Sequence, residues 1–277
     1  LAHTEGCGAS GGSSERLYAQ TLIGHLVHPI VGLGVLLEHG CEKTHNDYIK
    51  NDLAQLGINS KKYGWASVQL DGGIDAVTQK IEQWFNQSVT DLEDLTYSQG
   101  SLRDLNIGLM SIGKITSRVA SDLADFTQTI IGEGGTIVIP QNASLLESSN
   151  YTTEVIGNQD WKPTISYGES QIEPGLHIME TPTSHMIETI TGLGATGVDI
   201  MVAHIIGHPI QSHRMIPLLQ FSTDPTTQST YSLDLDQIDT SLLDLVLEIA
   251  SRQYTPKLFA KGNTDFQFTR GLLGISL

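Results

Sequence analysis

The residues best suited to chemistry lie in two short segments near the start of the chain. Residues 3–8 read His-Thr-Glu-Gly-Cys-Gly, and residues 38–47 hold two histidines, two glutamates, a cysteine, a lysine and an aspartate. Thiolate, imidazole and carboxylate groups are the usual ligands of first-row metal ions. The cysteines, Cys7 and Cys41, have glycine and polar neighbours, whereas a core cysteine normally has apolar ones. A metal or anionic-substrate site is therefore the leading hypothesis.

These two segments supply the predicted metal ligands. We expect His3 and Cys7 to converge from the first segment, and Glu42 and His45 from the second. Neither a C-x-x-C pair nor an H-E-x-x-H helix is present, so the spacing suits iron, manganese or zinc without selecting one. The alternative is that the cysteines pack against glycine turns and bind no metal.

Neighbouring residues indicate how a substrate is held. Lys43 is a candidate base for proton transfer if its pKa is lowered, with a plain surface lysine as the alternative. Asn46 is a predicted substrate-binding residue that orients a carboxylate. The glycine- and serine-rich run 6–14 precedes an expected helix, where backbone N–H groups favour an anion, although a solvated turn is equally compatible.

Polar residues later in the chain complete the candidate site. His208 and His213 lie on an expected loop, where contact with a ligand is more credible than inside a strand, and Thr181 follows another expected strand. Asn263 and Arg270 lie in a polar and aromatic stretch near the end of the chain, and a guanidinium suits two-point binding of a carboxylate. We predict His208 as a second proton-transfer candidate and the other four as substrate-binding residues.

The charge of the chain limits its partners. With 15 basic and 31 acidic residues, the net charge of −16 argues against nucleic acid, so an anionic substrate must be attracted by local positive groups or a metal ion. No apolar run of about 18 residues is present, so no membrane span is expected. Two cysteines make no disulfide framework and no signal peptide is recognisable, which favours a reducing, cytoplasmic location. The chain begins at Leu1 instead of Met, so we expect residues upstream of it, and a homodimer is left open.

Short apolar runs alternate with stretches of helical periodicity. This alternation predicts an α/β fold, Rossmann-like, with a mostly parallel sheet and helices on both faces. His25 and His28 fall on an expected helix and His204 in an apolar strand, so all three are expected to be structural. Residues 141–168 and 224–236 are expected to be irregular. The expected strands are 31–37, 66–70, 105–111, 136–139, 176–179, 198–206 and 218–221, and the expected helices are 13–28, 45–56, 74–89, 116–131, 186–193 and 240–252.

Two lobes are one arrangement of these elements. Residues 1–141 would form a first α/β lobe with the His, Cys and Glu cluster, residues 142–174 an irregular connection, and residues 175–277 a second α/β lobe. In parallel sheets the functional sites lie beyond the carboxyl ends of the strands. The Cys41 loop and residues 207–214 each follow an expected strand, so we expect them to meet at one sheet edge.

Five short motifs occur in the order that one known enzyme family shows. Residues 3–8 resemble an H-x-x-G-C-G element and residues 40–42 a G-C-E element. Residues 70–73, 179–182 and 263–266 are similar to D-x-G-G, M-D-T-P and N-E-F elements. The family they resemble is that of the altronate and galactarate dehydratases. The resemblance implies removal of water from an aldonic or aldaric acid with a divalent cation, iron or manganese in most cases and zinc or magnesium as alternatives.

The reaction implied by the resemblance is a β-elimination. A base removes the proton α to a carboxylate, the metal stabilises the enediolate, and an acid protonates the departing hydroxyl. Residues 111–117 stand where the family has an acidic, glycine-rich loop, and they read Ser-Ile-Gly-Lys-Ile-Thr-Ser. We expect a metal-dependent hydro-lyase, with a non-catalytic sugar-acid-binding or regulatory relative as the alternative. The dense segment 38–47 favours the enzyme, and the altered loop favours the alternative.

Overall fold

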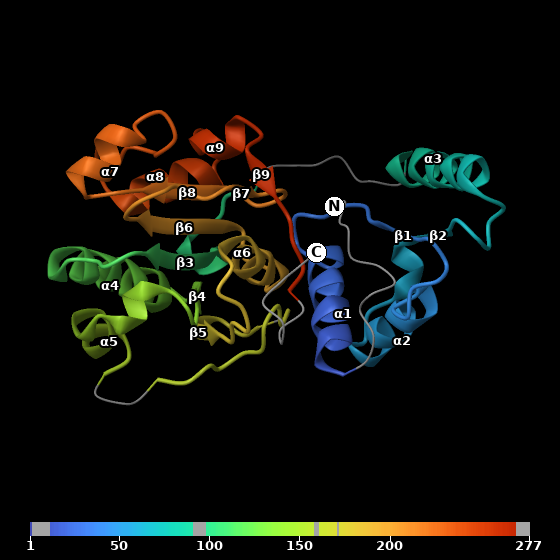
Figure 1. Cartoon of the computed structure of the whole chain (residues 1–277), viewed down its shortest axis with the longest axis horizontal. Helices are drawn as coiled ribbons and strands as arrows, with labels where there is room; N and C mark the ends of the chain where they lie inside the picture. The colour runs from blue at the N-terminus through green and yellow to red at the C-terminus, as the bar shows by residue number, and fades with distance from the viewer. Residues whose placement is uncertain (2–11, 91–97, 158–160, 171, 270–277) are drawn as a thin grey trace.

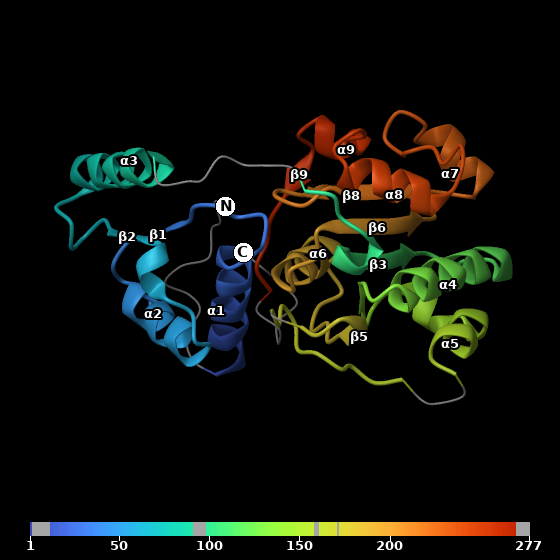
Figure 2. The ribbon, with the colours of Figure 1, turned by 180° about the vertical axis from the view of Figure 1, so that it is seen from behind.

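The molecule consists of two parts that lie side by side in both views (Figure 1, Figure 2). We call residues 12–90 the N-terminal unit and residues 98–269 the sheet unit. The computed structural model describes residues 1, 12–90, 98–157, 161–170 and 172–269.

The N-terminal unit combines helices with a two-stranded parallel sheet. Its elements are α1 (Ser13–Leu26), β1 (Val35–Glu38), α2 (Asn46–Gln55), η1 (Ser60–Lys62), β2 (Gly64–Ser67) and α3 (Ile74–Thr90). Helix α1 ends shortly before Pro29, which cannot continue a helix, and α2 ends before Gly57, which has a φ of 72°. Strands β1 and β2 pair in parallel from Val35 opposite Gly64 to Glu38 opposite Ser67. A small apolar core joins α1 to α2 through Ala19, Ile23, Ile49 and Leu53.

The sheet unit is larger and is built around a five-stranded sheet. Its helices are η2 (Leu102–Asp104), α4 (Ser117–Gly132), η3 (Ser144–Glu147), α5 (Ser149–Val155), α6 (Met186–Ala195), α7 (Pro225–Thr230), α8 (Leu242–Ala250) and α9 (Lys257–Ala260). Its strands are β3 (Asn106–Ile112), β4 (Thr136–Pro140), β5 (Gly175–Met179), β6 (Ile200–Ile205), β7 (Ser212–His213), β8 (Leu218–Phe221) and β9 (Thr264–Asp265). The short strands β7 and β9 pair with each other, outside the main sheet.

All five strands of the main sheet run in parallel in the order β5-β4-β3-β6-β8. From β3 the chain moves outward to β4 and β5, and then returns to the other side of β3 for β6 and β8. This reversal between β3 and β6 is the kind of switch point at which doubly wound sheets bind ligands. The arrowhead of β6 points away from the N-terminal unit in both views (Figure 1, Figure 2).

The sheet is buried because helices flank it. Every residue of β4 and β6 is buried, which explains why these strands read as continuous apolar runs instead of alternating patterns. Helix α6 packs so closely on β3 that a Cβ atom on Gly108 would lie 2.6 Å from a methyl group of Leu193. None of the helices in the described parts of the chain is long and apolar enough to span a bilayer.

The predicted α/β fold with a mainly parallel sheet is confirmed, but its organisation differs from the expectation. The strands come in separate sheets, and the main sheet takes β3 and β4 from residues 1–141 and β5, β6 and β8 from residues 175–277. These two stretches therefore share one sheet instead of forming separate lobes. The break between the two parts of the molecule falls earlier, between β2 and β3.

Three local expectations also need correction. The expected strand 31–37 begins only at Val35, after two glycines that β structure disfavours. The stretch 141–168 contains η3 and α5, and the stretch 224–236 contains α7. Helix α7 begins where the Asp224 side chain accepts a hydrogen bond from the Thr227 N–H, with Pro225 in the first turn. An aspartate followed by proline is a signal for the start of a helix. The polar composition of residues 224–236 led to the prediction of a loop instead.

Candidate functional site

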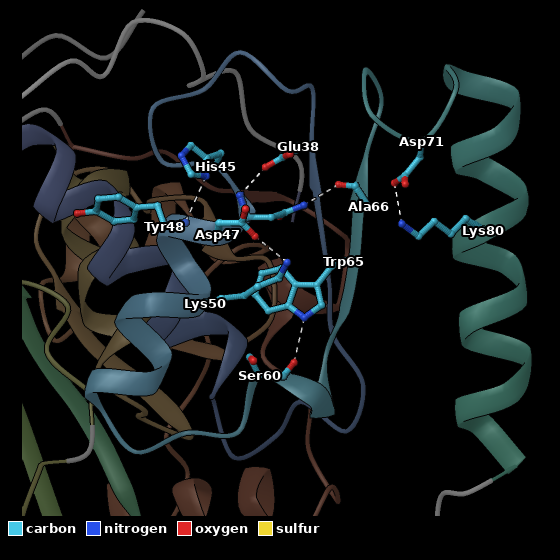
Figure 3. Close-up of polar contacts among 11 residues, drawn as sticks. Glu38, His45, Asp47, Tyr48, Lys50, Ser60, Trp65, Ala66, Asp71 and Lys80 are labelled. Carbon is cyan, nitrogen blue, oxygen red and sulfur yellow. Dashed lines mark hydrogen bonds and ion pairs between the residues drawn. The ribbon is translucent and has the colours of Figure 1, made fainter.

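A pocket of about 400 Å³ opens at the carboxyl ends of β1 and β2. This volume falls within the range of about 300–1,000 Å³ that small-molecule sites usually have. The pocket lies wholly within the N-terminal unit, between α2, the two strands and the start of α3 (Figure 3). It is lined by Glu38, Gly40, His45, Asn46, Asp47, Lys50, Trp65, Ala66, Ser67, Leu70, Asp71 and Lys80.

One wall of the pocket is fixed by a buried carboxylate and an amide. Glu38 ends β1, is buried, and accepts a short hydrogen bond from the backbone N–H of Asn46, the first residue of α2. The side-chain Nδ2 of Asn46 donates in turn to the carbonyl oxygen of Ala66 in β2, at 2.9 Å. A carboxylate at a helix N-terminus is favoured by the helix dipole. These bonds tie β1, α2 and β2 together at the pocket (Figure 3).

A lysine and a tryptophan form the second wall. The Nζ of Lys50 lies 3.0 Å from Oδ1 of Asp47 and 5.0 Å from the ring centroid of Trp65. The indole N–H of Trp65 donates to the carbonyl oxygen of Ser60 at 2.9 Å, which fixes the ring orientation. The hydrogen bond and the charge of Lys50 lower the pKa of Asp47. The pocket therefore presents an ammonium group beside a flat aromatic face.

A second ammonium group reaches the pocket from α3. Lys80 Nζ lies 2.8 Å from Oδ2 of Asp71, and the same oxygen accepts a hydrogen bond from the Ser67 N–H at 2.7 Å. The bond from Lys80, followed by that from Ser67, lowers the pKa of Asp71. The side chain of Lys80 is about half exposed, at 48%, so a ligand can reach its ammonium group. Each lysine of the pocket is thus held by one aspartate (Figure 3).

Two of the predicted metal ligands, Glu42 and His45, lie on the loop beside this pocket. Both carboxylate oxygens of Glu42 accept backbone N–H groups, from His39 and from Gly40, each at 2.8 Å. Burial alone would raise the pKa of Glu42, but the hydrogen bonds from these backbone groups outweigh it and lower the pKa. His45 caps α2, because its Nδ1 accepts the Tyr48 N–H at 3.3 Å. In that arrangement Nε2 carries the ring proton, so His45 must change tautomer before a ring nitrogen can bind a metal ion.

The Glu42 carboxylate suits a divalent metal chemically, since each of its oxygens keeps a second lone pair. Within the described ranges, however, no three His, Cys, Asp or Glu side chains converge as a metal site. Cys41 is exposed, with its Sγ 3.4 Å from Nδ1 of His39. The other two predicted ligands, His3 and Cys7, lie outside the described residues. Two of the four predicted ligands therefore lie on one loop.

Of the remaining predicted residues, Asn46 lines the pocket, and Lys43 is exposed on the neighbouring loop. Arg270 lies outside the described residues. The other four, which are Thr181, His208, His213 and Asn263, belong to the sheet unit and do not line the pocket.

These four residues form hydrogen bonds within their own part of the molecule. Thr181 Oγ1 accepts the Gln141 N–H at 3.1 Å, and His208 Nδ1 is bonded to the Tyr231 hydroxyl. His213 is fully buried, with Nδ1 accepting backbone N–H groups and Nε2 contacting another histidine, so neither nitrogen is left for a substrate. Asn263 is exposed next to β9 and pairs with Ser212 through its backbone.

Sequence reasoning missed the two lysines and the tryptophan of the pocket. Lys50 follows Asp47 at the i,i+3 spacing that places two side chains together on a helix. Asp71 follows β2 as the 39–45 loop follows β1, and parallel strands end at the same edge of their sheet. These two signals were present in the sequence, but the pairing of β1 with β2 was needed to connect them.

A larger cavity of about 880 Å³ lies in the sheet unit, beside the carboxyl end of β8. Phe221, Ser222 and Thr223 contribute to its lining, together with one face of α4 and the segment that leads into α8. Four aspartates line it against a single arginine: Asp122, Asp125, Asp236, Asp239 and Arg118. This excess of carboxylates makes it a poor place for an anionic substrate.

Comparison with known families gives a match to the part of the chain that holds the smaller pocket. Residues 1–93 match the family described as D-galactarate dehydratase/Altronate hydrolase, second domain. The match contains α1, α2 and α3, both strands of the small sheet, and every residue that lines the 400 Å³ pocket. The family predicted from the motifs is therefore supported for the first part of the chain. A search of curated proteins gives no match to the chain.

Proposed function

Starting from a domain of the D-galactarate dehydratase/altronate hydrolase family in residues 1–93, we propose that the chain is a hydro-lyase that dehydrates a sugar acid. The pocket at the carboxyl ends of β1 and β2 receives the substrate. The observation that carries this assignment is the pair of lysines, Lys50 and Lys80, that reach one pocket of the matched domain from two different helices.

The lining of the pocket suits an aldonic or aldaric acid. A chain with a net charge of −16 repels anions at long range, so binding of an acid needs local cations, which the two ammonium groups provide. The aspartates and Ser67 accept or donate hydrogen bonds to substrate hydroxyls, and the face of Trp65 provides a flat wall for the carbon chain. An aldaric acid carries a carboxylate at each end, which matches two ammonium groups best.

Dehydration requires a proton to leave the carbon next to the carboxylate and a C–O bond to break at the following carbon. The hydroxyl leaves as water after it has received a proton, and the enol product rearranges to a keto acid. We assign proton transfer to Lys43, on the loop beside the pocket, ahead of His208. His208 follows β6 in the other sheet, and its ring is bonded to Tyr231.

A divalent metal, iron or manganese, belongs to this proposal. When bound, such an ion supplies positive charge that stabilises the enediolate formed after proton removal. Glu42 and His45 are the proposed ligands from the second segment, His45 after a change of tautomer that frees a ring nitrogen, and His3 and Cys7 are the other proposed ligands. The backbone bonds of Glu42 hold its carboxylate in the ionised form that a metal needs.

Turnover and metal content test the proposal together. We expect the purified full chain to retain iron or manganese by elemental analysis and to form a keto acid from an aldonic or aldaric acid. Chelation is expected to abolish the activity and added metal to restore it. A thermal shift with the acid but no turnover, with or without metal, would favour the non-catalytic binding relative instead.

Matched lysine variants test the pocket itself. Lys50→Met and Lys80→Met keep the apolar stems and remove the charges, so we expect KM for the acid to rise about tenfold to hundredfold, as charged hydrogen bonds contribute about 1.5–3 kcal/mol. The control is Lys61→Met, because Lys61 is exposed on η1 and does not line the pocket. Equal KM values for all three variants would show that the acid binds elsewhere.

A further inference from the structure

The two parts of the molecule are docked through α1, which packs against α6 of the sheet unit (Figure 1). The contact is close, because a Cβ atom on Gly24 of α1 would lie 2.3 Å from the carbonyl oxygen of Ala195 in α6. Further along the interface, Tyr18 of α1 packs against Phe268, with ring centroids 4.7 Å apart and the ring planes tilted by 37°. The docking surface is therefore apolar and tightly packed.

Two histidines meet inside this docking surface, one from each part. His25 comes from α1 and His213 from β7, and their Nε2 atoms are 3.1 Å apart. The rings are stacked, with centroids 5.1 Å apart and an interplanar angle of 13°. Relative exposure is 4% for His25 and 0% for His213, so both residues are buried.

The hydrogen bonds around the pair define which nitrogens carry protons. His213 Nδ1 accepts the backbone N–H groups of Met215 at 3.1 Å and Ile216 at 3.2 Å, so the proton of His213 is on Nε2. His25 Nδ1 lies 2.7 Å from the carbonyl oxygen of Thr21 and must donate to it. The Nε2 of His25 is then the acceptor for the Nε2–H of His213. All four nitrogens are used, and the arrangement requires both rings to be neutral.

The groups that face the pair do not compensate an added positive charge. Phe266 turns its ring toward both histidines, at centroid distances of 5.0 Å and 5.8 Å. Among the side chains of the described residues, His28 also acts on the pair, and it disfavours a positive charge there. Asp199 acts on His28.

Asp265 pairs with His213 through the backbone of β9, and its carboxylate is already hydrogen-bonded to neighbouring residues. Its carboxylate accepts hydrogen bonds from the Phe266 N–H and from the side-chain amide of Gln267. Two further charged groups belong to elements that pack on β7, namely Glu188 in α6 and Lys257 in α9. Lys257 donates to the carbonyl oxygens of Ser232 and Leu235, away from the histidines.

We propose that His25 and His213 form an acid-sensitive latch that holds the N-terminal unit against the sheet unit only while both imidazoles are neutral. Uptake of one proton removes the acceptor nitrogen that the pair needs and places a cation in an apolar contact. The parts then separate at α1, and the main sheet stays folded because it keeps a large apolar core of its own. Acidification thereby changes how the substrate pocket and the sheet unit are joined.

The direction of the effect follows from the pKa values. Burial lowers the pKa of His25 from 6.5 to about 4 and lowers that of His213 well below 6.5. The docked state therefore binds fewer protons than the open state. Docking is strongest above pH 6.5 and weakens as the pH falls from there toward about 4. In this window each histidine raises the equilibrium constant for opening about tenfold for every unit by which the pH falls.

Hydrogen exchange at several pH values tests the latch on the intact chain. After correction for intrinsic rates, we expect opening of α1 and of β7–β9 to increase about tenfold to hundredfold per unit between pH 6 and pH 5, with β4 and β6 still protected. His25→Gln, whose amide oxygen can accept the His213 N–H without titrating, should reduce this slope by about half. The matched control is His185→Gln, because His185 is exposed and makes no side-chain cap bond.

Two results would overturn the latch. One is an unchanged pH slope in His25→Gln, and the other is opening of β4 and β6 together with α1, which would mean that acid unfolds the whole chain. Nitrogen chemical shifts of the wild-type histidines provide an independent measurement if the variant does not fold. We expect an Nδ1–H tautomer for His25 and an Nε2–H tautomer for His213 at pH 7, and titration of either ring near pH 6.5 would also refute the latch.

Discussion

The β1–β2 sheet and the main sheet of this protein use the polar residues at their carboxyl ends in opposite ways. At the end of β1 and β2, Lys50 and Lys80 are partly exposed and line an open pocket. Beside β6 and β8, His204 is buried and bonded to Thr223, and Asp224 caps α7. Residues of similar type thus form a binding surface in one sheet and stabilise local structure in the other. The difference arises because capping and burial already satisfy most of the polar atoms of the second group.

The comparison also extends to what holds each part together. The sheet unit depends on a large apolar core, whereas the pocket of the N-terminal unit depends on hydrogen bonds and ion pairs between short elements. Substitutions in the two parts should therefore lower the free energy of unfolding by different amounts, and these losses should respond differently to salt.

The largest effect is expected from Leu109→Ala in the main sheet. Leu109 is fully buried in β3, so the substitution leaves a cavity and should lower the free energy of unfolding by about 2–5 kcal/mol. Denaturant unfolding followed by circular dichroism measures the loss. The control is Leu247→Ala on α8, where the side chain is 37% exposed and a change within about 0.5 kcal/mol is expected. Similar losses for both variants would contradict the idea that this core dominates stability.

An intermediate effect is expected from Asn46→Ala in the N-terminal unit. The variant removes the donor that links α2 to the Ala66 carbonyl oxygen, and loss of a buried partner costs about 1–3 kcal/mol. Hydrogen exchange should report faster opening of β1, β2 and α2 but unchanged protection of β3 and β6. Asn51→Ala, on the exposed side of the same helix, is the matched control. Equal destabilisation of both sheets would show that the two parts unfold as one unit.

Much of the fold could be predicted from the sequence, because apolar periodicity determines which residues face a core. Helix α4 and strand β6 follow their patterns closely, since most of the buried residues in each are apolar. The division into separate sheets could not be predicted in this way. Periodicity identifies strands but says nothing about which strands pair, and β1 looks like any other strand of a doubly wound fold.

The candidate site could be predicted only in part, for a related reason. The dense polar segment predicts a site that includes Asn46 and His45, and both of these residues line the pocket. His213 is predicted to touch a substrate because it falls on an expected loop. The structure instead buries it against His25, a residue 188 positions away along the chain. Contacts between distant segments of this kind leave no signal in the local sequence pattern.

The smallest effect is expected at the ion pair between Lys80 and Asp71. Asp71→Asn keeps the size of the side chain and removes its charge, so α3 loses one anchor to β2 and the free energy of unfolding should fall by about 0.2–1 kcal/mol. The pKa of Asp71 is lowered in the folded chain, mainly by Lys80, so its contribution is present above pH 3.8 and is lost as the pH falls further.

Salt distinguishes the contribution of the Lys80–Asp71 ion pair from that of the Asn46 hydrogen bond. Raising the ionic strength to about 1 M shortens the screening length to about 3 Å, which should remove most of the difference between Asp71→Asn and the wild type but leave that of Asn46→Ala intact. Exchange at low and high salt measures both, at the α3 amides for Asp71→Asn and at the β1, β2 and α2 amides for Asn46→Ala. A difference for Asp71→Asn that persisted at high salt would mean that its hydrogen bond to the Ser67 N–H, and not its charge, fixes α3 over the pocket.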